Sequence, residues 1–222
     1  SSLTTKDVST LQTNVLNAVS TYNTDTLEDF TGMFRYSAVG KTIDEADTSI
    51  LSNITKIKMY KYITPTLSSG LKYTLSFNNA FYNPHSGHNS SAGGIVSSTG
   101  FKINDDSSTN EHFLDDNGEG AIRVYYLSGT TRIYTDSSFG TIDYTTGEII
   151  LTSANITSIS NVDGAASTQI RVTVTPSSND VVPVRNQVLS IDTANSSFTG
   201  SVDEIESGSS QAGTSYTTTS SY

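Results

Sequence analysis

The sequence contains no cysteine, so disulfide bonds and thiolate metal sites cannot hold the fold together. It contains no tryptophan either. Charged residues are also scarce: Lys, Arg, Asp and Glu make up 15% of the chain, against about a quarter in an average protein. No stretch approaches the roughly 18 to 20 uncharged apolar residues of a membrane helix. We therefore expect no membrane partner, and stability that comes from the burial of apolar side chains.

Hydroxyl side chains are abundant instead, with Ser and Thr at 69 of the 222 positions. They suit strands and close protein contacts, because a desolvated hydroxyl costs less free energy than a desolvated ion. The formal charge is −10 and is uneven: residues 1–110 carry eight basic and nine acidic groups, whereas residues 111–222 carry four and 13. Such an anionic half repels DNA and RNA, so we expect no nucleic-acid partner.

The first 52 residues have a helical pattern. Apolar residues recur at three- and four-residue steps from Val8 to Tyr22, and Thr5 is the predicted N-cap. A turn at Asn23–Asp25 and a second apolar set from Leu27 to Phe34 predict another helix, and a short third helix is expected at Tyr36–Glu45. We assign residues 1–52 to a helical segment.

From residue 53 the pattern changes to short β-branched and aromatic runs separated by turns, which predicts antiparallel sheet. A long loop rich in turn formers is expected at residues 83–100. Gly147 supplies the positive φ of a tight hairpin, and Pro183 places the segment Val181–Leu189 at a sheet edge. The predicted strands are Ile54–Ile63, Leu71–Phe77, Phe101–Ile103, Ala121–Leu127, Thr131–Tyr134, Thr141–Tyr144, Glu148–Leu151 and Gln169–Thr175.

The fold class we predict is α+β: a short N-terminal helical segment, a mainly antiparallel β-rich domain over residues 53–205, and an extended tail over residues 206–222. The tail is composed of Gly, Ser, Thr, Gln, Ala and Tyr after Glu206, a composition that does not fold alone. The chain starts at Ser1 without a methionine. We interpret it as a fragment or C-terminal part of a longer polypeptide.

Two groups of side chains could bind a metal ion. His85, His88 and His112 with nearby aspartates at positions 105, 106, 115 and 116 could form a zinc site, but the paired histidines lie in a Gly/Ser loop that does not fix their spacing. The stretch Asp115–Glu119 resembles calcium loops, yet lacks their full ligand spacing, and a turn between strands explains the same residues. We assign no metal ligand.

No pattern of catalysis is present. The sequence has no nucleophile elbow, no phosphate-binding loop and no dinucleotide loop. The adjacent acids Asp44–Glu45 and Asp203–Glu204 cannot face each other as glycosidase carboxylates do. A basic cluster of Lys56, Lys58, Lys61 and Lys72 alternates with Tyr60, Tyr62 and Tyr73, and we interpret it as a solvated face or a contact with an acidic neighbour. We predict no enzyme, no catalytic residue and no cofactor.

Three runs of residues carry a resemblance to a known family. They are Phe34–Ser37 with Ile43–Asp44 and Ser49–Thr55, then Gly140–Ile149, then Val182–Val188. Together they resemble the carboxy-terminal part of the ring-forming baseplate wedge subunit of T-even-type myoviruses, which is related to the baseplate J proteins of simpler contractile tails. This family has no catalytic residues to transfer to the chain.

The resemblance implies a structural protein of the phage virion, located in the tail baseplate and assembled in the host cytoplasm. Copies would pair, the pairs would form a ring around the tail hub, and other baseplate wedge proteins would dock on them. The alternative is an extracellular β-rich adhesin or carbohydrate-binding module, with Tyr60, Tyr62, Tyr125, Tyr126 and Tyr134 as sugar platforms. A hydrolase is a third class, which would need a compact acid pair or a metal ion.

Overall fold

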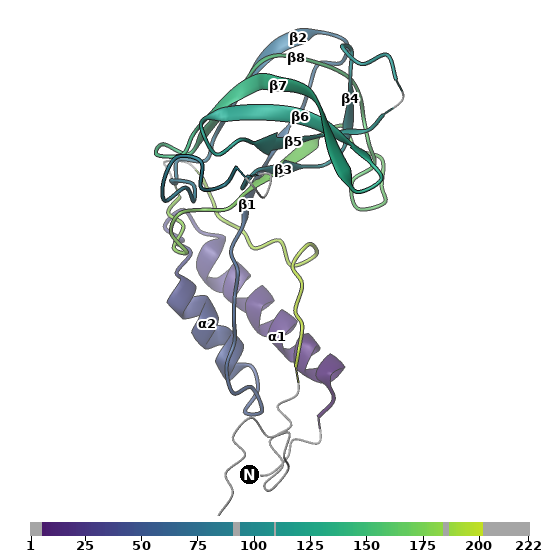
Figure 1. Ribbon diagram of the computed structural model, residues 1–222. Helices are drawn as coiled ribbons and strands as arrows, with labels where there is room; N and C mark the ends of the chain where they lie inside the picture. The colour runs from purple at the N-terminus through teal and green to yellow at the C-terminus, as the bar shows by residue number, and fades with distance from the viewer. Residues whose placement is uncertain (1–5, 91–93, 109, 184–186, 202–222) are drawn as a thin grey trace, which may run out of the picture. The chain divides into compact units, whose positions relative to one another are not determined.

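The computed structural model of the chain describes residues 6–90, 94–108, 110–183 and 187–201 (Figure 1). The fold is α+β, as predicted: helices come first and mainly antiparallel strands follow. The chain forms two compact units, one from residues 1–29, 37–53 and 189–222 and one from residues 30–36 and 54–188. The predicted tail, residues 206–222, lies outside the described residues. The domain boundaries at residues 52 and 205 stay predictions.

The first unit is built on helix α1 (Val8–Tyr22), which buries Val15 and Val19. Its N-cap is Asp7 and not the predicted Thr5, which lies outside the described residues. The Asp7 carboxylate accepts a hydrogen bond from the backbone N of Thr10 at 2.7 Å, because an N-cap oxygen replaces the partner that the first helical N–H groups lack. Hydrogen bonding to Thr10 also lowers the pKa of Asp7.

The predicted turn at Asn23–Asp25 and the second helix over Leu27–Phe34 are wrong. The chain continues without a break into a π-helical turn, η1 (Asn23–Leu27), and the residues from 28 to 35 are not helical. Contacts distant in sequence hold this turn. The Asn23 side chain accepts a hydrogen bond from the backbone N of Ile191 at 2.6 Å and donates one to Glu28 at 2.8 Å, while Leu27 is fully buried.

Helix α2 (Tyr36–Glu45) has the predicted bounds and buries Val39 and Ile43. Beyond it, the buried carboxylate of Asp47 accepts hydrogen bonds from Lys6 at 2.5 Å and from Asn14 at 3.0 Å. The bond from Lys6 is the main cause that lowers the pKa of Asp47. One aspartate therefore ties the residues before α1, α1 itself and the residues after α2 into one unit.

Among its described residues, the second unit contains nine strands, and the pairings between them are antiparallel. A three-stranded sheet has the order β1-β9-β3, and a six-stranded sheet has the order β2-β8-β4-β5-β6-β7. The strands are β1 (Met59–Ile63), β2 (Gly70–Ser76), β3 (Ser97–Ser98), β4 (Phe101–Ile103), β5 (His112–Asp116), β6 (Ala121–Ser128), β7 (Thr131–Asp143), β8 (Glu148–Ile159) and β9 (Ile170–Val174).

Strand β8 closes the larger sheet into a barrel, whose curved strands lie at the top of Figure 1. Its first part, Glu148–Leu151, pairs with β7, and its last part, Ile156–Ile159, pairs with β4. Because β4, β5, β6 and β7 also pair in that order, the ring of strands is complete. Closure leaves these five strands with paired edges and encloses a core that includes Leu114, Ile122 and Ile149.

Several strand bounds differ from the prediction. Strand β1 begins at Met59 and not at Ile54, the two strands predicted within residues 131–144 form the single strand β7, and β8 extends eight residues beyond Leu151. Strand β5 was missed. Within the loop predicted at residues 83–100, Ser97–Ser98 form the short strand β3. At the predicted edge segment, Val181 makes an isolated bridge with Phe34, and residues 182–183 and 187–189 form no strand.

The predicted hairpin between β7 and β8 is confirmed. Asp143 pairs with Glu148, and Gly147 has a φ of +70°. The site is also crowded, because a Cβ at position 147 would lie 2.0 Å from the backbone O of Asn79. Glycine is required here both for its backbone angle and for its lack of a side chain.

Candidate interaction surface

Alternate residues of β5, β6 and β7 point away from the barrel core and gather on one face. Register places Phe113 and Asp115 of β5 opposite Tyr125 and Arg123 of β6, and Tyr125 in turn opposite Tyr134 of β7. The set, which we call the arginine–tyrosine patch, consists of Phe113, Asp115, Arg123, Tyr125, Leu127, Arg132 and Tyr134.

Asp115 is the buried centre of the arginine–tyrosine patch. One carboxylate oxygen, Oδ1, accepts a hydrogen bond from Arg123 Nε at 2.9 Å; the other, Oδ2, accepts from Arg132 at 2.7 Å and from the Tyr134 hydroxyl at 2.8 Å. Burying an ion is costly unless it is paired and hydrogen-bonded, and here three donors from two strands satisfy it. The carboxylate thus fixes both guanidinium groups.

The two guanidinium groups also stack on tyrosine rings. The Arg123 guanidinium lies 4.3 Å from the ring centroid of Tyr134, and that of Arg132 lies 4.6 Å from the ring centroid of Tyr125. The rings of Tyr125 and Tyr134 are themselves 5.9 Å apart. Burial raises the pKa of Tyr134, and its hydrogen bond to Asp115 raises this pKa further, so the hydroxyl stays a donor. Each guanidinium group is thus held both by the Asp115 carboxylate and by a tyrosine ring.

Asp116, the second acid of the calcium-like stretch, points to the other face of β5 and is fully buried. Its Oδ1 accepts from the backbone N atoms of Ile95 and Val96 at 2.6 and 2.9 Å, and its Oδ2 accepts from Gly118 N at 3.3 Å and from the Tyr144 hydroxyl at 2.5 Å. Both acids therefore have protein partners. The predicted turn between strands is confirmed for residues 117–120, which join β5 to β6, but Asp115 and Asp116 themselves lie in strand β5.

The histidines of the zinc hypothesis fall into two places. His85 and His88 are neighbours on an exposed loop, with 3.1 Å between a nitrogen of each ring. His112 is buried on β5, and its Nε2 lies 3.1 Å from both Asp106 Oδ2 and Thr135 Oγ1. Burial lowers the pKa of His112, although Asp106 opposes that shift. Across the described residues, no group of three or more His, Asp or Glu is placed to hold a metal ion.

The remaining acids and lysines of the sequence hypotheses have ordinary surroundings. Asp44 accepts a hydrogen bond from Asn53 at 2.8 Å, and Glu45 lies 3.7 Å from Lys41. Asp203 and Glu204 lie outside the described residues. Of the four clustered lysines, Lys61 donates a hydrogen bond to the backbone O of Ser76 at 2.6 Å, and burial lowers its pKa.

The tyrosines of the sugar-platform hypothesis form three separate groups. Tyr60 and Tyr62 pack edge to face at 5.4 Å, Tyr126 packs against His112, and Tyr125 pairs with Tyr134 in the arginine–tyrosine patch. A sugar ring stacks on an open aromatic face. In the patch a guanidinium group already covers one face of each tyrosine, and the first pair is perpendicular, so neither pair presents a shared flat platform.

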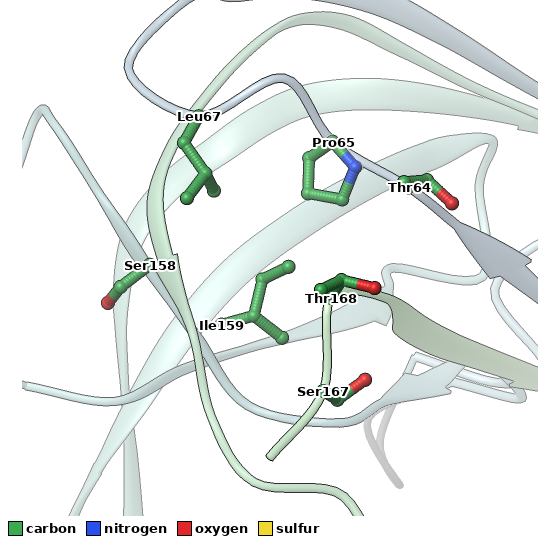
Figure 2. Close-up of a pocket in the computed structure, with 7 residues that line it drawn as sticks. All are labelled: Thr64, Pro65, Leu67, Ser158, Ile159, Ser167 and Thr168. Carbon is green, nitrogen blue, oxygen red and sulfur yellow. The ribbon is translucent and has the colours of Figure 1, made fainter.

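A shallow groove of about 410 Å³ lies beside the end of β8 (Figure 2). Figure 2 shows the side chains of Pro65, Leu67 and Ile159 turned toward the same space, with hydroxyl groups of Ser and Thr around them. No residue that lines it carries a charge. The groove offers contact area, and the residues that line it include no general base to activate their Ser and Thr hydroxyl groups.

Large apolar side chains are exposed within residues 30–54. Phe30 is 77% exposed, Leu51 is 79% exposed and Ile54 is 92% exposed. Leu51 belongs to the first unit, whereas Phe30 and Ile54 belong to the second, so each is a separate exposed apolar position and not part of one defined surface. Among the helices in the described residues, none is long and apolar enough to cross a lipid bilayer.

Comparison with known proteins points to the class of structural proteins in phage tails. Residues 2–62 match the family described as "Baseplate structural protein gp6, C-terminal domain III". No curated protein matches the chain. The match includes α1, α2 and the first four residues of β1, as well as the exposed residues Phe30, Leu51 and Ile54.

Over residues 2–62 the chain is thus similar to a T4-type baseplate wedge protein in its C-terminal part, which confirms the resemblance predicted from sequence. The match supports a structural role in a bacteriophage baseplate. It points to the tail of the virion as the location and to other baseplate proteins as partners.

Proposed function

We propose that this chain is a scaffold subunit which associates with further copies of itself into a ring around the tail hub and docks other baseplate wedge proteins. The observation that carries the proposal is the family match over residues 2–62, because the matched family is a structural one and the matched segment contains the most exposed apolar side chains of the described residues. No residue is assigned a catalytic, cofactor or metal role.

The exposed side chains in that segment are suited to association. Full burial of a side chain such as Phe, Leu or Ile contributes about 1.5–3 kcal/mol, and association must first offset the loss of translational and rotational freedom. Each of Phe30, Leu51 and Ile54 would contribute about this much free energy to an interface that covers it. The hydroxyl-rich, weakly charged surface provides further area that is cheap to desolvate.

Size-exclusion chromatography with light scattering, followed by electron microscopy, tests the proposal. We expect masses that are multiples of 23.7 kDa and ring-shaped or arc-shaped particles at high protein concentration. A monomer at every concentration, combined with specific binding on a glycan array, would instead support the carbohydrate-binding alternative.

A further inference from the structure

We propose that the arginine–tyrosine patch docks an acidic, partly apolar segment of another baseplate protein. The inference deepens the proposed function and rests on it for the identity of the partner. The surface itself lies on β5, β6 and β7, outside the family-matched residues 2–62. It therefore adds a docking site that the match does not supply.

Charge favours an acidic partner at this place. The second half of the chain, residues 111–222, has four arginines and no lysine against 13 acids. Two of those four arginines, Arg123 and Arg132, are in the patch, where Asp115 balances one of their charges. The patch is thus a cationic spot within the acidic half of the chain, which attracts a short acidic segment, while the charge of that half as a whole opposes a long polyanion.

Preorganisation makes the arginines effective. Arg123 and Arg132 are each held by Asp115 and by a tyrosine ring, so binding does not have to freeze their side chains. The side chain of Arg132 still keeps 37% of its surface exposed. Guanidinium groups favour carboxylate partners, so the exposed part of the Arg132 side chain is the place where a partner carboxylate would approach.

The exposed apolar surface of Leu127 and Tyr134 predicts that the partner segment also contains apolar side chains. Leu127 lies opposite Arg132 in the strand register and is half exposed, and the Tyr134 ring is partly exposed next to them. Tyrosine and arginine are the residue types that most often dominate binding energy at protein interfaces. A segment with alternating acidic and apolar side chains would place a carboxylate on Arg132 and an apolar group on Leu127.

The test is fluorescence anisotropy of the full chain with a fluorescein-labelled peptide of sequence Glu-Leu-Asp-Phe-Glu-Leu, compared with a peptide that has lysine at each acidic position. We expect saturable binding of the acidic peptide only. Arg132→Gln should weaken binding at least about tenfold, as expected for the loss of a charge-assisted hydrogen bond. Leu127→Ser, a change at an exposed position, should weaken it several-fold.

Arg171→Gln is the matched control. Arg171 also pairs with an aspartate, Asp163, at 2.9 Å and also lies over a tyrosine ring, that of Tyr60 at 5.8 Å, but it is not in the patch. This variant should bind like the wild type. Thermal unfolding of each variant shows whether it is folded. If Arg132→Gln does not fold, Leu127→Ser still tests the proposal.

Three results would overturn the proposal: no binding of the acidic peptide, equal loss in Arg171→Gln and Arg132→Gln, or stronger Arg132-dependent binding of single-stranded DNA than of the peptide. The outcomes remain distinct from those of the assembly test. If the chain forms rings but does not bind the peptide, the proposed function is supported and the docking site is refuted. If the chain is a monomer that binds the peptide through Arg132, the docking site is supported and the proposed ring assembly is refuted.

Discussion

Removal of the buried charge at Asp116 should destabilise the β-barrel unit strongly. In Asp116→Asn the amide oxygen can still accept from the backbone N atoms of Ile95 and Val96, but the amide NH2 group then faces the N–H of Gly118. Hydrogen bonds to charged groups contribute about 1.5–3 kcal/mol and neutral ones about 0.5–1.5 kcal/mol. The weaker hydrogen bonds and the unpaired N–H of Gly118 together predict that the free energy of unfolding falls by about 3–5 kcal/mol.

The assay is chemical and thermal unfolding followed by circular dichroism. For a chain of this length, 1 kcal/mol corresponds to about 2–4 °C in Tm, so Asp116→Asn should lower the Tm by about 10 °C. Tyr144→Phe removes a single hydrogen bond to Asp116 and should cost about 1.5–3 kcal/mol. In the double variant the two losses should not add, because both act on the same carboxylate.

Asp105→Asn is the control, since Asp105 is an exposed aspartate of the same unit. It should change the free energy of unfolding by less than about 0.5 kcal/mol. If Asp116→Asn is as mild as this control, or if its effect adds fully to that of Tyr144→Phe, the reasoning that the carboxylate is a satisfied buried anchor is refuted.

Three further changes test other parts of the fold. Gly147→Ala should destabilise by about 1–3 kcal/mol more than Gly129→Ala in denaturant titrations, because both glycines have positive φ but only position 147 lacks room for a Cβ. Burial lowers the pKa of His112, so the folded state favours the neutral imidazole. The stability that this provides is present above the unfolded pKa of 6.5 and is lost as the pH falls through the folded pKa. His112→Gln should therefore reduce the drop in Tm between pH 7.5 and 5.5, whereas His85→Gln, at an exposed position, should not. Leu27→Ala should cost about 2–5 kcal/mol in the helical unit, measured by loss of helical ellipticity in urea.

Features set by neighbours in sequence could be predicted. Helix α2 follows from its apolar spacing, and the β7–β8 hairpin follows from a glycine between two apolar strands. Helix α1 was predicted, but its cap was misplaced by two residues, which is a typical uncertainty at a helix end. The continuation of α1 through Asn23 could not be seen, because the bond from Ile191 that satisfies the Asn23 side chain is 168 positions away.

The candidate site was mostly hidden for the same reason. Asp115 and Asp116 look like turn residues, and strand β5 was missed, because their burial depends on partners such as Arg132 and Tyr144 on other strands. The sequence analysis named Tyr125 and Tyr134 only as sugar platforms, in one set with Tyr60, Tyr62 and Tyr126. The signal that could have located the rest was charge: two arginines nine positions apart, alternating with tyrosines, in a half of the chain that is otherwise acidic.

If this protein works by contact through the exposed side chains of its baseplate-like segment, removal of those side chains must lower its mass in solution. Sedimentation equilibrium of the wild type and of the variant Phe30→Ser, Leu51→Ser, Ile54→Ser tests it most directly. We predict a concentration-dependent mass above 23.7 kDa for the wild type and a return toward 23.7 kDa for the variant. A wild-type mass of 23.7 kDa at all concentrations, or the same larger mass for both proteins, would contradict the claim.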